Sequence, residues 1–272
     1  MLRTLLFALT LGLWAVPVAN PVNAQESALR RLDTGDDGRG WEAVGRLELA
    51  GRGFCTGALI APDLVLTAAH CLYDRATGAR IDHEKIEFLA GWRNGRASAY
   101  RWVGRAVVHP DYVQTREVAA ERVRNDVALL ELRQPIRNAR IAPFATDARP
   151  APGHRVGVVS YARDRADVPS LQEVCEVIAR QEGVLVMSCD VDYGSSGAPV
   201  FTFDGVAPRV VSVVSAMAEV DGQKVSLGTQ LQAPLAELKA QLAAGLGGHA
   251  GQGAFMAKAG QIRDTGAKFA KP

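Results

Sequence analysis

The feature that most constrains the fold is a series of short apolar or alternating segments, separated by turn residues, that begins after Trp41. Runs of about four to eight such residues bounded by Gly, Pro, Asn or Asp are typical of β-strands. A linker around residues 150–153 divides the series into six segments before it and six after it. Many short strands at close spacing predict an all-β protein, either a sandwich or a barrel. The segments are Val44–Leu49, Gly57–Ile60, Leu64–Ala68, Ile86–Ala90, Tyr100–Val108, Val127–Leu132, Arg155–Ser160, Gln172–Ile178, Leu185–Cys189, Pro199–Phe203, Arg209–Ser215 and Val225–Gln230.

The C-terminal part of the chain departs from the strand pattern. Leucines recur at helical spacing between residues 231 and 242, which predicts a closing helix over 234–242 that packs on the second half of the chain. Residues 243–272 are rich in Gly and Ala with scattered Lys, and they carry few large apolar groups. Because such a segment cannot bury enough surface to fold alone, we expect a disordered tail.

Residues 1–24 have the layout of a secretory signal peptide. A short basic start precedes the apolar stretch Leu5–Val16, and small residues at 22–24 suit cleavage after Ala24. A membrane anchor is the alternative, which we disfavour because the stretch is short and Pro17 breaks it. We therefore expect a secreted or periplasmic protein with no membrane attachment after cleavage.

Charge and composition limit the partners of the mature chain. The formal net charge is +2, and acidic and basic residues are mixed without a basic stripe, so nucleic acid is not an expected partner. The polar, Gly-rich residues 25–40 predict a flexible leader. A calcium loop there is disfavoured, because Val44 stands where the closing carboxylate is needed. We expect a monomer with no cofactor.

Four cysteines in an exported chain favour two disulfides, for which three pairings exist. We prefer the pairings that are close in sequence, Cys55 with Cys71 and Cys175 with Cys189. Each closes a loop of about 15 residues, which is worth about 3 kcal/mol in the chain-entropy model. A metal site is disfavoured, because the chain has no C-x-x-C pair and its histidines lack zinc-ligand spacing.

A His, an Asp and a Ser occur in contexts that suit nucleophilic catalysis. A Ser hydroxyl is a weak nucleophile until a neighbouring base takes its proton, and a neutral imidazole is the usual base. A buried carboxylate must then hold the imidazole in the right tautomer. The sequence therefore predicts His70, Asp126 and Ser196 as catalytic residues. They lie in the segments Leu66–Cys71, Asn125–Leu130 and Gly194–Pro199.

Each of these residues also has a structural interpretation when taken alone. His70 could be a packed core histidine, Asp126 a turn residue and Ser196 part of a Gly-Ser surface loop. Their occurrence together favours catalysis. The flanking glycines of Ser196 allow a tight turn in which backbone N–H groups stabilise an oxyanion. The other histidines are interpreted as structural or without a role: His83, His109, His154 and His249.

The order His, Asp, Ser and the motifs T-A-A-H-C, D-V-A-L-L and G-S-S-G-A-P resemble the trypsin-like (chymotrypsin-fold) serine peptidases, more narrowly their bacterial secreted members. The resemblance covers roughly Trp41 to Leu242. It implies two six-stranded antiparallel β-barrels, about 41–148 and 149–242, with a C-terminal helix. It also implies hydrolysis of protein or peptide substrates through an acyl-enzyme.

The resemblance assigns further roles near the nucleophile. It places the oxyanion hole at the backbone N–H groups of Gly194 and Ser196, and it supports the Cys55–Cys71 pair beside the catalytic His. Ser195 occupies the position where the animal digestive branch has an Asp that pairs with a freed N-terminus. That activation switch cannot operate here in the same form, and we interpret Ser195 as structural rather than as the nucleophile.

Specificity is predicted from Asp190, which lies six residues before Ser196. In the trypsin branch an Asp at this position forms the floor of the pocket for the P1 side chain, so we expect cleavage after Arg or Lys. Ser215 and Met217 are the other expected pocket residues, although the branch has a Gly where Met217 stands. Two alternatives remain open: a small or apolar P1 preference, with Asp190 a solvated acid, and a non-catalytic binding member of the same fold.

Overall fold

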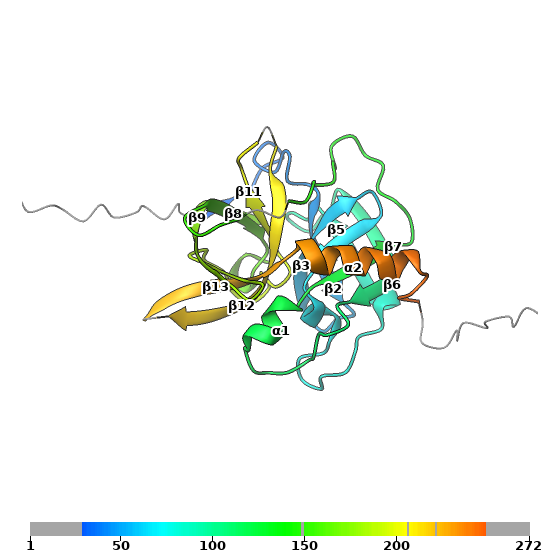
Figure 1. Cartoon of the computed structure of the whole chain (residues 1–272). Coiled ribbons are helices and arrows are strands. Elements are labelled where there is room, and N and C mark those ends of the chain that lie inside the picture. Colours follow the sequence, from blue (N-terminus) through cyan, green and yellow to red (C-terminus); the bar gives the residue numbers. More distant parts are fainter. Residues whose placement is uncertain (1–28, 148–149, 206, 221, 249–272) are drawn as a thin grey trace, which may run out of the picture.

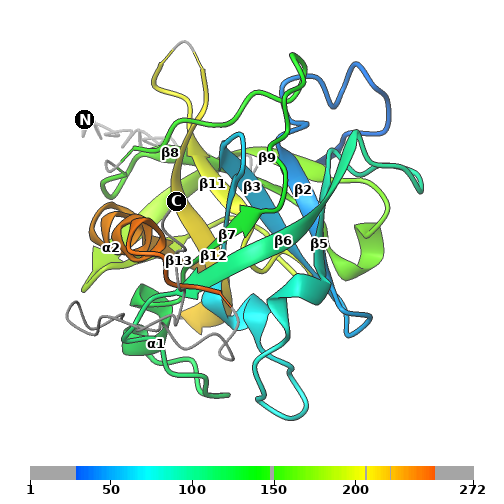
Figure 2. The same ribbon diagram turned by 90° about the vertical axis from the view of Figure 1, so that its right-hand side faces the viewer.

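The computed structural model describes residues 29–147, 150–205, 207–220 and 222–248, and it contains two β-barrels (Figure 1). The first barrel closes in the strand order β2-β3-β4-β7-β6-β5, and every pairing in it is antiparallel. Figure 2 turns this barrel toward the viewer. Its strands are β2 (Val44–Leu49), β3 (Phe54–Ala61), β4 (Leu64–Thr67), β5 (Ile86–Ala90), β6 (Ala99–Val108) and β7 (Ala128–Leu132).

The second barrel follows the order β8-β9-β10-β13-β12-β11 and closes through the pairing of β11 with β8. Its strands are β8 (Arg155–Ser160), β9 (Ser170–Gln181), β10 (Val184–Met187), β11 (Pro199–Thr202), β12 (Arg209–Val220) and β13 (Gln223–Gln230). The helices are α1 (Ala120–Arg124) and α2 (Gln232–Ala243), with short 3₁₀ turns at Ala69–Leu72, His83–Lys85 and Arg163–Arg165.

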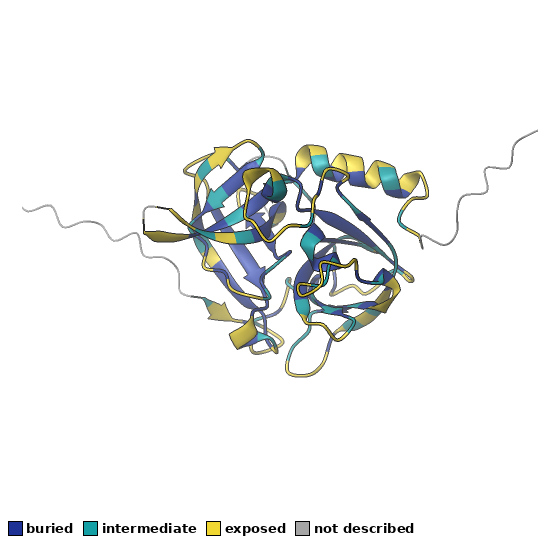
Figure 3. Ribbon diagram, turned by 90° about the horizontal axis from the view of Figure 1, so that it is seen from below, coloured by how far each residue is buried: buried dark blue, intermediate teal, exposed yellow. Residues whose placement is uncertain are grey.

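The predicted all-β fold of two six-stranded barrels is confirmed, and each of the twelve expected strands is present. Alternation explains why the prediction works. In β2, Leu47 and Leu49 are buried in the barrel, whereas Arg46 and Glu48, which precede them, are partly exposed. A period of two thus separates the inner face from the outer face of a barrel strand. Figure 3 shows the resulting buried interior of each barrel and the exposed loops around it.

Aromatic side chains join the two barrels. The ring of Trp41 lies 5.0 Å from that of Phe201 in β11 and 6.0 Å from that of Phe144 in the connection between the barrels. The fully buried Tyr161, which follows β8, donates its hydroxyl hydrogen to the carbonyl of Trp92 in the first barrel over 2.8 Å. These contacts hold the barrels in a fixed relation, which a site between them requires.

We expected the C-terminal helix to pack on the second half of the chain. This prediction is wrong, because the helix packs on the first barrel (Figure 1). Leu235, Leu238 and Leu242 are buried against the core that includes β6 and β7. Arg105 of β6 donates to the carbonyl of Leu242 over 3.0 Å. The leucine spacing identified the apolar face of the helix, but spacing carries no information about which surface that face covers.

The described parts of the expected flexible leader and disordered tail, residues 29–40 and 243–248, are held by contacts with the barrels. Residues 30–31 form the short strand β1, which pairs with β9, and Leu32 is completely buried. The expectation of a flexible leader is therefore corrected for residues 29–40: one buried leucine and a strand pairing hold them. Of the expected tail, residues 243–248 are described, and the Gly247 carbonyl accepts from Ala106 over 2.9 Å. The expected signal peptide at 1–24 and tail residues 249–272 lie outside the described residues.

Both predicted disulfides are confirmed. Cys55 bonds to Cys71 with Cα atoms 6.2 Å apart, and Cys175 bonds to Cys189 with Cα atoms 5.0 Å apart. The first links β3 to the turn that carries His70, and the second links β9 to the segment after β10. Within the described ranges, no helix has both the length and the apolar character needed to cross a membrane.

Candidate active site

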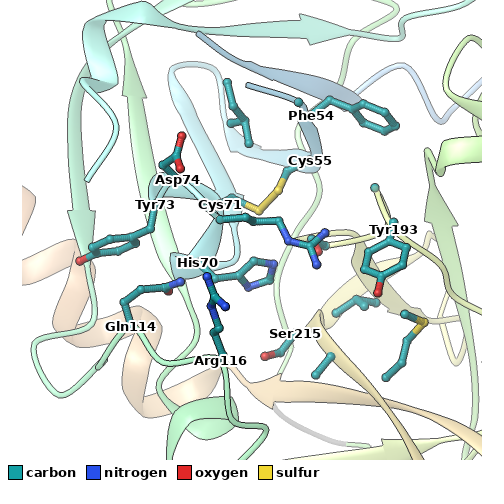
Figure 4. A pocket seen from close by; sticks show the side chains of 18 of the residues that line it. Phe54, Cys55, His70, Cys71, Tyr73, Asp74, Gln114, Arg116, Tyr193 and Ser215 are labelled. Carbon is teal, nitrogen blue, oxygen red and sulfur yellow. A yellow bond between two sulfur atoms is a disulfide. The ribbon is translucent and has the colours of Figure 1, made fainter. Parts of the chain in front are cut away.

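A cleft of about 690 Å³ lies between the two barrels (Figure 4). The first barrel contributes Phe54, the Cys55–Cys71 disulfide and His70 to its wall. The second barrel contributes residues of the loop before β11, among them Ser196, and the residues 214–217 of β12. The volume is in the usual range for ligand sites, and the cleft brings together segments far apart in the sequence.

His70 and Asp126 form a hydrogen-bonded pair in this cleft. The ring Nδ1 of His70 lies 2.7 Å from Oδ2 of Asp126, and the backbone N–H of His70 donates to Oδ1 over 2.9 Å. The carboxylate therefore binds both the ring and the backbone of the same residue. This arrangement assigns the ring proton to Nδ1 and leaves Nε2 as the acceptor that faces the cleft.

Asp126 is completely buried and lies two residues before β7. The hydroxyl of Ser215 donates to Oδ2, and the hydroxyl of Thr229 in β13 donates to the Asp126 carbonyl over 3.2 Å. Burial alone would raise the pKa of Asp126, but the charge and hydrogen bonds of His70, together with the Ser215 hydroxyl, hold it below its ordinary value. The buried group is thus kept as a carboxylate.

Arg122 adds a second cation beside this carboxylate. Arg122 belongs to α1, and its Nη1 lies 3.7 Å from Oδ2 of Asp126, two residues beyond the end of that helix. The side chain is largely buried. Nearby, burial and the Asp126 charge raise the pKa of Tyr112, so its hydroxyl stays protonated and donates to Gln114 over 2.5 Å. The carboxylate therefore lies within a network that extends beyond the His–Asp pair.

The loop that carries Ser196 belongs to the second barrel but is bonded to the first. Thr56 of β3 donates its backbone N–H to the Ser196 carbonyl over 2.9 Å and its hydroxyl to the Gly194 carbonyl over 2.9 Å. A Cβ on Gly197, whose φ is +74°, would come within 2.1 Å of the Thr67 hydroxyl. Glycine is therefore needed here for both backbone conformation and close approach.

Two backbone donors near Ser196 are free to bind a ligand. In the described part of the chain, the N–H groups of Gly194 and Ser196 have no hydrogen-bond partner. Ser195 differs, because it is fully buried, with its hydroxyl 3.2 Å from that of Ser160 and 3.4 Å from the Tyr161 carbonyl. Ser196 lines the cleft and Ser195 does not.

Comparison with known proteins identifies the family of the chain. Residues 55–207 match the family model described as a trypsin-like peptidase domain. The chain belongs to this family. Serine protease 23 of Mus musculus is 29% identical over 166 residues, which are 54% of this chain and 42% of the mouse protein. Serine protease 1 of Rattus norvegicus is 32% identical over 104 residues, which are 38% of this chain and 37% of the rat protein.

The match therefore spans less than half the length of these curated relatives. A solved structure described as Glu endopeptidase in complex with MPD has the same fold. Its TM-score is 0.65 at 18% identity, and the alignment covers 79% of this chain and 97% of that one. At that identity the likeness concerns the fold alone.

The residues expected to form the specificity pocket of a trypsin-like peptidase are only partly brought together. Ser215 and Met217 line the cleft, but the Ser215 hydroxyl is engaged with Asp126. Asp190 is exposed and does not line the cleft. This corrects its expected place on the pocket floor. Alternation along the chain is the cause, because Cys189 and Val191 are turned inward and the residue between them is turned to solvent.

Apolar side chains line this part of the cleft. Val191 and Val214 are buried in the wall of the cleft, and Ala216 and Met217 complete it. Ser215 is the extra residue of a β-bulge in β12, between the partners of Leu227 and Gly228. A bulge re-aims a side chain, which explains why this hydroxyl reaches the Asp126 carboxylate.

The one group of His, Cys and acidic residues in the described ranges whose ligand atoms are close enough for a metal is Cys55, His70 and Cys71, within 4.8 Å. The two sulfur atoms are bonded to each other, so they offer no thiolate ligand. This group therefore does not fit a metal centre.

Sequence reasoning missed the residues that support the site. Thr56, Arg122 and Thr229 contact it from a strand, a short helix and another strand, respectively. Each is an ordinary residue in its local context, and only the fold brings it to Asp126 or to the loop that carries Ser196. Position Arg122 did carry one signal, since it lies four residues before Asp126, the spacing at which helical side chains pair.

Proposed function

We propose that this chain is a serine endopeptidase that hydrolyses proteins or peptides through an acyl-enzyme on Ser196, with His70 as the base and Asp126 as the residue that orients it. The observation that carries the proposal is the hydrogen-bonded pair of His70 and Asp126, which lies in the same cleft as Ser196. The Ser196 loop is hydrogen-bonded to the barrel that contains this pair.

The chemistry follows from the placement of donors and acceptors. His70 Nε2 takes the proton of the Ser196 hydroxyl as the oxygen attacks the scissile carbonyl. The free N–H groups of Gly194 and Ser196 stabilise the resulting oxyanion. The imidazolium then protonates the leaving amine, and a water molecule, activated by the same base, hydrolyses the ester.

The edge of β12 offers a place for the acyl half of the substrate. Beyond Val214, this strand pairs with β13 on one side, and no described strand covers its other edge. Residues 214–217 of this edge line the cleft. An extended peptide can add to such an edge as a further strand, with alternate side chains in pockets.

The geometry favours a small or apolar P1 side chain over Arg or Lys. The carboxylate of Asp190 is outside the cleft, and Val191, Val214 and Met217 form an apolar wall near Ser196. Burial of a charged P1 side chain against this wall without a partner is costly, whereas burial of an apolar one is favourable.

We also propose that the protein is exported, to the periplasm or the medium, and acts as a monomer. Its two disulfides are of the kind that persists in oxidising compartments, and residues 1–24 have the composition of a signal peptide.

Labelling with a fluorophosphonate tests the catalytic assignment, because the reagent reacts with an activated serine. We expect labelling of the unaltered protein and of Ser195→Ala, and none of Ser196→Ala or His70→Ala. Circular dichroism shows whether each variant is folded. Absence of labelling in the folded, unaltered protein would contradict the proposal and favour a binding member of the fold. Labelling of Ser196→Ala but not of Ser195→Ala would make Ser195 the nucleophile.

A further inference from the structure

The charged side chains around the cleft are mostly arginines. Five arginines line it, against the carboxylates of Asp74 and Asp192. Nη1 of Arg52 binds Asp74 over 2.8 Å, and Arg122 is engaged with Asp126. Among the described residues, the remaining three arginines have no carboxylate partner: Arg75, Arg116 and Arg163.

Two of these arginines share one aromatic ring. The guanidinium carbon of Arg75 lies 4.7 Å from the ring centroid of Tyr193, and that of Arg163 lies 4.6 Å from it. The backbone N–H of Arg163 also donates to the Tyr193 carbonyl over 2.7 Å, which ties the two residues together. Two cations beside one ring repel each other, and an anion that lies next to the ring relieves the repulsion.

The position of the ring relative to Ser196 indicates which part of a substrate it meets. At the Gly197 end, the nucleophile loop is bonded to Val214 of β12, where the acyl half is proposed to lie. At the Gly194 end, it lies against Phe54 and against Ala162, the residue before Arg163. A peptide that crosses Ser196 from the β12 edge therefore continues past Tyr193 and the two arginines.

We propose that Arg75, Arg163 and Tyr193 form a subsite for an acidic side chain of the substrate on the leaving-group side of the scissile bond. This inference rests on the proposed peptidase function. Guanidinium groups bind carboxylates with charge-assisted hydrogen bonds, and the aromatic ring holds the guanidinium groups in place. The three residues together are named the arginine–tyrosine subsite.

Quenched fluorescent peptides that differ only in a Glu or a Gln test the subsite. The residue is placed at the first, second or third position after the scissile bond, and every peptide carries a C-terminal amide, so that only side-chain carboxylates are compared. We expect kcat/KM to be about fivefold higher for Glu than for Gln at one of these positions. The ratio should fall toward one in Arg75→Gln and Arg163→Gln, and toward one in the unaltered protein at high salt.

Arg116→Gln is the matched control. Arg116 lines the same cleft, but among the described residues only Arg75 and Arg163 place a guanidinium group over the Tyr193 ring. Arg116→Gln should keep the Glu/Gln ratio. If the Glu/Gln ratio of kcat/KM falls equally in Arg116→Gln and Arg163→Gln, the preference comes from the overall positive potential of the cleft, and the subsite is contradicted. A ratio of one in the unaltered protein would overturn it outright.

Binding without turnover separates this inference from the proposed function. The affinities of the Glu and Gln peptides for Ser196→Ala, measured by calorimetry, should differ by the same factor as the kcat/KM values and should become equal when Arg163→Gln is added. If Ser196→Ala binds the Glu peptide more tightly than the Gln peptide but the unaltered protein cleaves no peptide, the result would support the subsite and contradict the peptidase function. Equal affinities would contradict the subsite, whatever the protein cleaves.

Discussion

Thr56 of the first barrel donates its backbone N–H to the carbonyl of Ser196 in the second barrel over 2.9 Å. Its hydroxyl donates to the Gly194 carbonyl and accepts the N–H of Tyr161 over 3.1 Å. One fully buried threonine thus fixes both ends of the segment that contains the proposed nucleophile and the proposed oxyanion donors. The position of Ser196 relative to the His70–Asp126 pair therefore depends on this contact between the barrels.

Replacement of this hydroxyl should separate the two effects of Thr56. In Thr56→Val, the Gly194 carbonyl and the Tyr161 N–H lose a partner inside the protein, so we expect the free energy of unfolding to fall by about 1–3 kcal/mol. We also expect kcat to fall about tenfold with little change in KM, because the Gly194 peptide is less firmly held for the transition state. Thr56→Ser keeps the hydroxyl and should keep kcat. A Thr56→Val protein with unchanged kcat would show that this bond is structural only.

Gly197 should tolerate no side chain. Its φ of +74° disfavours any other residue, and an added Cβ would meet the Thr67 hydroxyl at 2.1 Å and the Thr56 carbonyl at 2.5 Å. Gly95 has a similar φ of +80° but open space around it. Gly95→Ala should therefore cost about 1–2 kcal/mol for the backbone conformation alone, and Gly197→Ala several kcal/mol more. Urea unfolding of both variants measures the difference, and equal midpoints would mean that the loop can move away from β3.

The parts of the molecule that could be predicted from the sequence are those with a local cause. The alternation in Val44–Leu49 is enough to identify a barrel strand, and the glycines beside Ser196 are enough to indicate a tight turn. Asp190 shows the limit of counting along the chain. Its distance of six residues from Ser196 is right for a pocket floor, but Cys189 and Val191 take the inward positions.

Residues placed by the fold alone could not be predicted. Thr229 reaches the Asp126 carbonyl across a separation of 103 positions, and α2 covers β6 and β7 although it follows β13 in the chain. No local pattern determines such pairings, because they depend on how the barrels close and meet. The arginine–tyrosine subsite has the same origin, since Arg75 and Tyr193 belong to different barrels.

Asp126 should make folding stability depend on pH in the acid range. Its pKa in the folded protein is lowered by His70 and Ser215 in spite of burial, so the folded state binds its proton less readily than the unfolded chain, where the value is about 3.9. The stabilisation is therefore complete above about pH 5 and is lost as the pH falls through the lowered value.

Comparison with Asp126→Asn isolates this contribution from those of other carboxylates. The difference in unfolding free energy between the unaltered protein and Asp126→Asn, measured in urea at a series of pH values, should shrink as the pH falls below about 5. Peptidase activity of Asp126→Asn should be several orders of magnitude lower at neutral pH, because the amide no longer fixes the imidazole tautomer. A difference in stability that stays constant down to pH 2 would contradict the lowered pKa.

The P1 pocket gives the last prediction. Because Asp190 is exposed and its backbone N–H is bound to Gln172 over 2.8 Å, Asp190→Ser should leave the relative kcat/KM for P1 Arg, Leu and Ala unchanged. Met217 lines the cleft and is 41% exposed, so we expect its side chain to limit the size of the P1 group rather than to support the core. Met217→Gly should therefore raise kcat/KM for P1 Phe relative to P1 Ala by about tenfold, which corresponds to burial of a few additional methylene equivalents. A peptide library varied only at P1 measures both effects. A preference for Arg that disappears in Asp190→Ser would instead mean that the carboxylate enters the pocket when substrate binds.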